Sequence, residues 1–219
     1  MKPGTTRAFS LANTMNVSSL IQIFASRTAL PVDIEKDVLP ELRKMGVSDE
    51  IYPFWDIELD PGTLQGYCHR EEIPTQDGSY FMTTIGFAKD GPEMERLVTC
   101  KELLHILDPK TCRVSSADKV YGLISKIALR ADLIEPFSDQ DDQSDRVAVL
   151  EALAILFPME ARNALLPYFR NNELTLAQIA EYAELPPSYV KYALSDNWPR
   201  IHDVLIRGRQ HREKSEGAS

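Results

Sequence analysis

The sequence contains little cysteine, and its cysteines form no recognisable pattern. There are three, Cys68, Cys100 and Cys112, and no two of them make a Cys-x-x-Cys pair. An odd number without such a pair is typical neither of a disulfide scaffold nor of a zinc finger. Reduced thiols are usual in the cytoplasm, so we expect a cytoplasmic protein.

Long apolar runs and an excess of positive charge are also missing. No run approaches the roughly 20 apolar residues that cross a bilayer, so we expect no membrane partner. The 24 Lys and Arg residues are outnumbered by 33 Asp and Glu, which gives a net charge of −9. Such a balance disfavours general binding to nucleic acid.

The chain does have enough apolar residues for a folded core. Its 219 residues are 43% hydrophobic, which fits one domain with a small subdomain. The first 32 residues hold no acid, as in transit peptides, but helical apolar spacing begins at Leu20. We therefore expect a flexible tail over 1–15, a domain over 16–206 with a short helical subdomain from about 159, and a flexible tail over 207–219.

The first half of the domain alternates between helical and extended patterns. Apolar spacing predicts a helix over 16–27 and another from an Asp33 cap to about residue 44, ended by Gly46. Short apolar segments over 50–92, broken by Pro and Gly and with a turn at 76–78, predict a small mixed or antiparallel sheet. A helix over 93–107 follows, so the expected fold class is α+β.

The second half has mainly helical patterns. We expect helices over 116–129 and from about Asp145, separated by an acidic loop at 135–145 that lacks the glycine and final Glu of a calcium loop. Short helices complete the domain. Residues 175–194 have the rhythm of a helix-turn-helix, with a core of Ile179, Ala180, Val190 and Leu194.

The segment with the clearest chemical pattern is Lys101-Glu102-Leu103-Leu104-His105. Zinc peptidases use His-Glu-x-x-His on a helix, where the two imidazoles share one face and hold the metal, and the Glu acts as general base. Here the Glu and the second His are present, while Lys101 stands at the first His position. Glu-x-x-His alone also occurs by chance as a solvated helix pair.

The surroundings of this segment resemble the ImmA/IrrE family of intracellular zinc metallopeptidase-like proteins. The family has Arg-Phe-Thr-hydrophobic-Ala before its metal motif, and this chain has RLVTC at residues 96–100. LPVDIE at 30–35 is similar to the family's N-terminal helix, and ALAILFP at 152–158 is similar to its Phe-Ala-Ala-x-Leu-Leu-Met-Pro signature. Residues 174–194 are similar to its closing helices, and the resemblance implies a zincin-like core.

The chain departs from the family at the metal ligands. Counting back from Pro158, the family's third ligand, a Glu, falls on Val147, while Asp145 and Glu151 are out of register. We therefore expect neither metal nor cofactor, with Glu102 as a vestigial general base. The ammonium of Lys101 either replaces the metal and compensates Glu102, or extends to solvent.

The resemblance implies a catalytically degenerate protein-binding or regulatory module linked to transcriptional or mobile-element (prophage) control. Its partner would be a protein, with transcriptional regulators as candidates, bound near Lys101, Glu102 and His105. One alternative is an active zinc metallopeptidase whose ligands are His105, Asp145 and Glu151. Another is a DNA-associated regulator using 175–194, although its second helix offers only Lys191 as a cation.

Two cysteine-containing patterns are more simply structural. Cys100 lies beside Lys101, which would favour a reactive thiol, but about 100° of rotation per residue turns it away from His105. We expect it to be a small core residue. Cys68 and His69 are neighbours on a predicted strand, where successive side chains point to opposite faces, so joint metal ligation is not expected.

Overall fold

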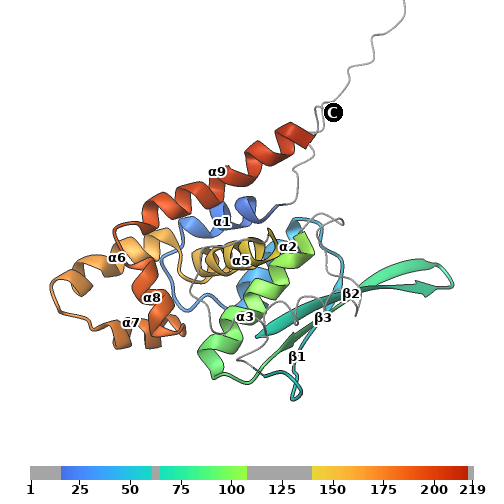
Figure 1. Cartoon of the computed structure of the whole chain (residues 1–219), viewed down its shortest axis with the longest axis horizontal. Coiled ribbons are helices and arrows are strands. Elements are labelled where there is room, and N and C mark those ends of the chain that lie inside the picture. Colours follow the sequence, from blue (N-terminus) through green and yellow to red (C-terminus); the bar gives the residue numbers. More distant parts are fainter. Residues whose placement is uncertain (1–15, 61–64, 108–139, 217–219) are drawn as a thin grey trace, which may run out of the picture.

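The computed structural model describes residues 16–60, 65–107 and 140–216, and in the last segment it describes side chains over 147–207. A layer of helices lies on one side of a small sheet (Figure 1). The α+β class predicted from the sequence is confirmed. The tail over 1–15, the helix over 116–129 and Cys112 lie outside the described residues.

The N-terminal helices begin at side-chain caps, of which the sequence predicted Asp33. Helix α1 (Val17–Ala25) starts after Asn16, whose side chain accepts a hydrogen bond of 2.8 Å from the Ser19 amide. Asp33 caps the next helical segment in the same way, at 2.8 Å from the Lys36 amide. That segment is a π-helix, η1 (Ile34–Val38), followed by α2 (Leu39–Lys44). Gly46, at a φ of 95°, follows its end.

The sheet has three strands and is mixed. Strands β1 (Glu50–Trp55), β2 (Gly66–Thr75) and β3 (Gly78–Phe87) lie in the order β1-β3-β2. β1 runs parallel to β3, and β2 forms an antiparallel hairpin with β3 around the predicted turn. Gly78 at this turn has a φ of 143°, which a side chain would strain.

The predicted central helix is present as α3 (Pro92–Leu104), continued by the 3₁₀ turn η2 (His105–Leu107). α3 packs against β2 and β3 on one side and against α5 (Gln140–Leu156) on another. α5 also packs against α1. α5 begins at Gln140, so the last residues of the predicted acidic loop, 140–145, are helical instead.

Four further helices complete the described chain: α6 (Met159–Arg170), α7 (Leu176–Ala183), α8 (Pro187–Ala193) and α9 (Trp198–Glu216). α9 lies along α1 (Figure 1), and the Ser18 hydroxyl donates to the Leu205 carbonyl at 2.9 Å. The chain past residue 207, predicted as a tail, continues α9 to Glu216. In the part of the chain that the structure describes, no helix has the length and apolar character of a membrane span.

Candidate functional site

The motif helix is one of the most deeply enclosed elements of the molecule. Every residue of α3 from Leu97 to Leu104 is buried. This is unusual for a helix that carries charges, because an isolated surface helix buries only one stripe. The sheet covers one side of α3 and α5 another, so the charged residues of the motif must find partners inside the protein.

Lys101 and Glu102 form an ion pair in this interior. Their exposed fractions are 6% and 3%, and the Lys101 Nζ lies 2.8 Å from the Glu102 Oε1. Lys101 therefore does not extend to solvent, which removes that alternative. Burying either charge alone would be costly, whereas the pair compensates itself through one short, charge-assisted hydrogen bond.

His105 lies at the edge of the same cluster. Its Nε2 is 3.8 Å from the second carboxylate oxygen of Glu102, and its side chain is 25% exposed. It is the first residue of the 3₁₀ turn η2, three positions after Glu102. Lys101, Glu102 and His105 are thus brought together as predicted, with the imidazole as their most accessible member.

Gly66, which is not among the predicted site residues, brings the sheet directly onto this pair. A β-carbon at this position would lie 2.4 Å from the Val98 Cγ1 and 3.2 Å from the Glu102 Cγ. Only glycine allows β2 to approach α3 so closely. The available signal was a glycine at the first residue of a predicted strand.

The positions considered for additional metal ligands, Asp145, Val147 and Glu151, do not complete a metal site in the described part of the chain. Glu151 is 1% exposed on α5, the helix that packs against α3, whereas Val147, at the family's ligand position, is 38% exposed. The side chain of Asp145 lies outside the described residues. Within residues 16–60, 65–107 and 147–207, no group of three or more His, Cys, Asp or Glu side chains is arranged to hold a metal ion.

The donors near the motif do not fit a zinc ion in the described part of the chain. A protonated Lys has no lone pair to donate, and it engages one oxygen of Glu102 at 2.8 Å. His105 is then the only imidazole of the motif. A catalytic zinc needs three protein ligands and a structural zinc four, so we derive no chemical step through a metal here.

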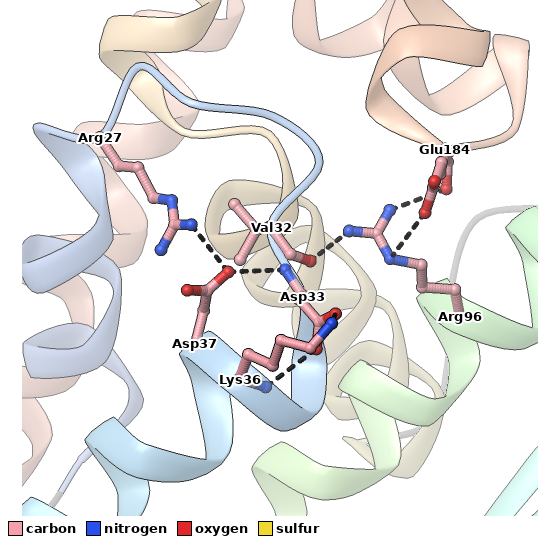
Figure 2. Close-up of polar contacts among 7 residues, drawn as sticks. All are labelled: Arg27, Val32, Asp33, Lys36, Asp37, Arg96 and Glu184. Carbon is pink, nitrogen blue, oxygen red and sulfur yellow. Dashed lines mark hydrogen bonds and ion pairs between the residues drawn. The ribbon is translucent and has the colours of Figure 1, made fainter.

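Arg96, one turn before the pair, joins segments that are far apart in the sequence (Figure 2). Its guanidinium donates to the carbonyls of Ala183 at 2.6 Å and Glu184 at 2.9 Å, and also to the Val32 carbonyl. Burial lowers the pKa of Arg96, although nearby Glu184 opposes the shift. Three of the four stretches that carry the family resemblance, 30–35, 96–105 and 174–194, therefore meet at one side chain.

The segment around Val32 is itself fixed by an ion pair. Arg27 donates to the Asp37 carboxylate at 2.7 Å, and the same oxygen accepts the Asp33 amide at 2.8 Å (Figure 2). Asp33 also pairs with the Lys36 ammonium at 3.2 Å. These contacts hold the Val32 carbonyl where Arg96 reaches it.

The two cysteines in the described part of the chain lie as expected. Cys100 is fully buried, and burial raises the pKa of its thiol to about 12, so the thiolate needed for a nucleophile is disfavoured. Cys68 pairs with Ile85 and His69 with Thr84 in the β2–β3 register. Because successive strand residues point to opposite faces, Cys68 and His69 do not share a site.

The helix-turn-helix pattern corresponds to α7 and α8, and its four predicted core residues are buried. Thr175 and Gln178 form a capping box at its start. Lys191 is the one cation of α8, and Glu181, Glu184 and Asp196 lie in or beside the two helices. This charge pattern does not favour contact with DNA phosphates.

A small apolar cavity lies on another side of α3. Its volume is about 210 Å³, and it is lined by residues of η1, α2, β1, β3 and α3: Ile34, Glu35, Leu39, Ile51, Pro53, Ile85, Thr99 and Leu103. The Thr99 hydroxyl is engaged with the Glu95 carbonyl at 2.7 Å. The cavity offers space for an apolar side chain but few polar groups to orient a substrate.

Comparison with known proteins does not assign a class. No protein-family model matches the chain, and no curated protein matches it. The structural observations define a mixed α+β protein with a buried cation–carboxylate pair on its central helix.

Proposed function

We propose that this chain is a catalytically degenerate relative of the ImmA/IrrE-type zinc metallopeptidase-like proteins, with a zincin-like core, that acts by binding a protein partner. The observation that carries the proposal is the buried Lys101–Glu102 ion pair, 2.8 Å between Nζ and Oε1. The lysine stands at the first imidazole position of the motif. Its ammonium supplies positive charge beside Glu102, where an active relative would use a metal.

The chemistry of the pair argues against peptide hydrolysis. A general base must take a proton from an activated water, so its carboxylate oxygen must be open to that water. In this chain one oxygen of Glu102 accepts a hydrogen bond from Lys101, and the other lies 3.8 Å from His105. Glu102 is therefore engaged as a structural carboxylate, and it is 3% exposed.

A binding role is supported by what remains accessible beside the pair. His105 is the partly exposed member of the cluster, with 25% of its side chain open. The start of β2 lies against the same stretch of α3 at Gly66. A protein segment that contacts His105 would thus also lie near a strand, which provides backbone hydrogen-bonding groups. Transcriptional regulators, in prophage or other mobile-element control, are the partner class that the family resemblance suggests.

The metal part of the proposal is tested by elemental analysis of protein purified without added metal. We expect far less than one zinc per chain in the wild type and no chelator-sensitive peptidase activity. Lys101→His should increase zinc retention, because two imidazoles four residues apart share a helical face. Lys191→His on α8 is the matched control, since it adds an imidazole away from the motif. Stoichiometric zinc and chelator-sensitive cleavage in the wild type would instead establish the active peptidase.

The binding part is tested by a photo-crosslinking amino acid at position 105, with position 168 on α6 as a control. The Tyr168 side chain is 51% exposed and lies on a different helix. We expect a protein adduct at 105 that is absent at 168. Equal capture at both positions, or none at 105 in cells that express the protein, would contradict a binding role for this cluster.

A further inference from the structure

The sheet has a second face that no helix in the described part of the chain covers. In Figure 1 the helices lie on one side of the sheet, and the β2–β3 hairpin extends beyond them. The strand register shows which residues point each way, because side chains alternate along a strand. Gly66 abuts Val98 and Glu102 of α3, and Ile85 is in the core. Residues of even number on β1 and β3, and of odd number on the facing part of β2, point away from the helices.

This uncovered face is rich in aromatic side chains. Tyr52, Phe54 and Tyr80 are 51%, 38% and 37% exposed, and Tyr67 is partly buried between strands. Phe54 and Tyr67 meet edge to face, with ring centroids 6.2 Å apart. We name these four residues the tyrosine face. An uncovered set of neighbouring aromatic rings is a common feature of protein interfaces.

Gly86 makes room for one of these rings. A β-carbon on Gly86 would lie 2.4 Å from the Tyr67 Cε1, so the ring lies directly over the β3 backbone. Gly86 pairs with Phe54 on one side and with Tyr67 on the other. The absence of a side chain at this position is therefore what allows Tyr67 to contact Phe54 across the central strand.

Among the strand residues, which the structure describes in full, the Asp, Glu, Lys and Arg side chains on this face are all acidic, and His69 is its one imidazole. Glu50 and Glu71 are exposed, and Asp56 follows the end of β1. The Tyr52 hydroxyl donates to Glu50 at 2.9 Å, and the Tyr67 hydroxyl donates to Asp56 at 3.0 Å. Arg70, the one cation of the strands, points to the helix side, where it bonds Asp49.

Together these features specify a partner with positive charge. Aromatic ring faces attract cations, arginine above all, and carboxylates held beside them accept its planar guanidinium. Two tyrosine hydroxyls fix two of the carboxylates next to the rings before a partner arrives. We propose that the tyrosine face, with Glu50 and Asp56, binds an arginine-rich segment of a partner protein.

This proposal does not depend on the metallopeptidase resemblance, because the tyrosine face and the Lys101–Glu102 pair lie on opposite sides of the sheet. One of the two proposals can fail without the other.

The experiment uses the full chain and a fluorescein-labelled peptide of alternating arginine and glycine, followed by fluorescence anisotropy. We expect saturable binding that weakens as salt is added. Tyr52→Ala combined with Phe54→Ala should raise the Kd about fivefold or more, since exposed cation–π contacts contribute modestly. Glu50→Gln, which keeps the shape of the side chain, should raise it by a smaller factor.

The matched control is Tyr168→Ala combined with Tyr182→Ala, which removes two tyrosines of similar exposure, 51% and 55%, from α6 and α7. The control should leave the Kd unchanged, and a lysine–glycine peptide should bind more weakly than the arginine peptide. All four substituted aromatics are exposed, and circular dichroism checks that each variant is folded.

Three outcomes would overturn the proposal. The first is no saturable binding of the arginine peptide. The second is an equal change of Kd in the test and control variants, which would assign binding to the overall charge of −9. The third is concentration-dependent self-association that Tyr52→Ala with Phe54→Ala abolishes, which would make the face an interface between copies of this chain.

Discussion

Arg96 and Lys101 are both cations of α3, the first partly buried and the second buried, and the protein holds them in different ways. Arg96 donates to backbone carbonyls of two other segments, one just before η1 and one at the C-terminal end of α7. Lys101 pairs with the residue next to it in its own helix, Glu102. The bonds of Arg96 join distant parts of the chain. The bond between Lys101 and Glu102 stays within α3 and neutralises the charge of the carboxylate.

Arg96 therefore has a structural role in the fold, whereas Lys101 has a role within the candidate site. An arginine bonded to carbonyls 64 and 87 positions away stabilises the tertiary fold directly. A lysine that pairs with its neighbour adds no long-range link through that bond; its effect is to make a buried carboxylate tolerable. We therefore expect the two residues to respond differently when their partners are changed.

The largest expected effect comes from Arg96→Ala. It removes charged hydrogen bonds to the carbonyls of Val32, Ala183 and Glu184 and leaves these acceptors without the guanidinium. At about 1.5–3 kcal/mol for each bond to a charged group, and with incomplete additivity, we expect a loss of about 5 kcal/mol. Urea denaturation of wild type and variant measures it. A loss below about 1 kcal/mol would show that the guanidinium is not what joins these segments.

The next effect comes from Lys101→Met, which leaves Glu102 buried without the ammonium 2.8 Å away. Breaking one side of a buried pair costs about 3–5 kcal/mol, and we expect a value near the lower limit. Adding Glu102→Gln to this variant should recover most of the loss, because the uncompensated charge is gone. If the double variant is as unstable as the single one, Lys101 is not there to compensate Glu102.

The sequence predicted the local structure well where the signal was local. Asp33 is recognisable as a cap, Gly46 as a stop, and the apolar spacing of residues 93–107 as a helix. The π-helical turn at Ile34–Val38 was not predicted. Pro40 has no amide hydrogen to donate, and the backbone hydrogen bonds just before it therefore change from the α-helical to the π-helical pattern. A regular α-helical spacing hides such a change.

The partners of Arg96 and Lys101 could not be predicted in the same way. Arg96 binds carbonyl oxygens, which every residue has, so nothing in the sequence marks Ala183 or Val32 as its acceptors. The Lys101–Glu102 cluster was predicted only because its members are adjacent. The exposed face of the sheet needed the strand register, since a shift of one residue would have turned Tyr52 and Phe54 toward the helices.

His202, a buried base with one unpartnered ring nitrogen among the described residues, should behave unlike either cation. It is 6% exposed, and within the described residues its Nε2 has no hydrogen-bond partner. Burial lowers its pKa from 6.5, although Asp203 opposes the shift. The unfolded chain therefore binds a proton at a higher pH than the folded chain, so stability is full above about pH 6.5 and falls below it.

The measurement is the free energy of unfolding of wild type and His202→Asn at several pH values. One proton contributes at most about 1.4 kcal/mol per pH unit, so the wild type should lose about 1 kcal/mol more than the variant between pH 6.5 and 5.5. If wild type and variant lose stability equally as the pH falls, then His202 takes up its proton in the folded protein. Its burial would then not set the charge state of the imidazole.

The smallest expected effect comes from Glu184→Gln, which tests whether Arg96 is held by the carboxylate or by the backbone carbonyl of Glu184. The Glu184 carboxylate is 60% exposed and lies 4.0 Å from the Arg96 Nε, whereas its carbonyl accepts the Arg96 Nη1 at 2.9 Å. An exposed ion pair of this kind is worth less than about 1 kcal/mol, so Glu184→Gln should cost only about 0.3 kcal/mol. It keeps the backbone acceptor and the length of the side chain. A loss comparable with that of Arg96→Ala would move the anchor from the carbonyls to the carboxylate, and Arg96 would then resemble Lys101 in being held by a charge.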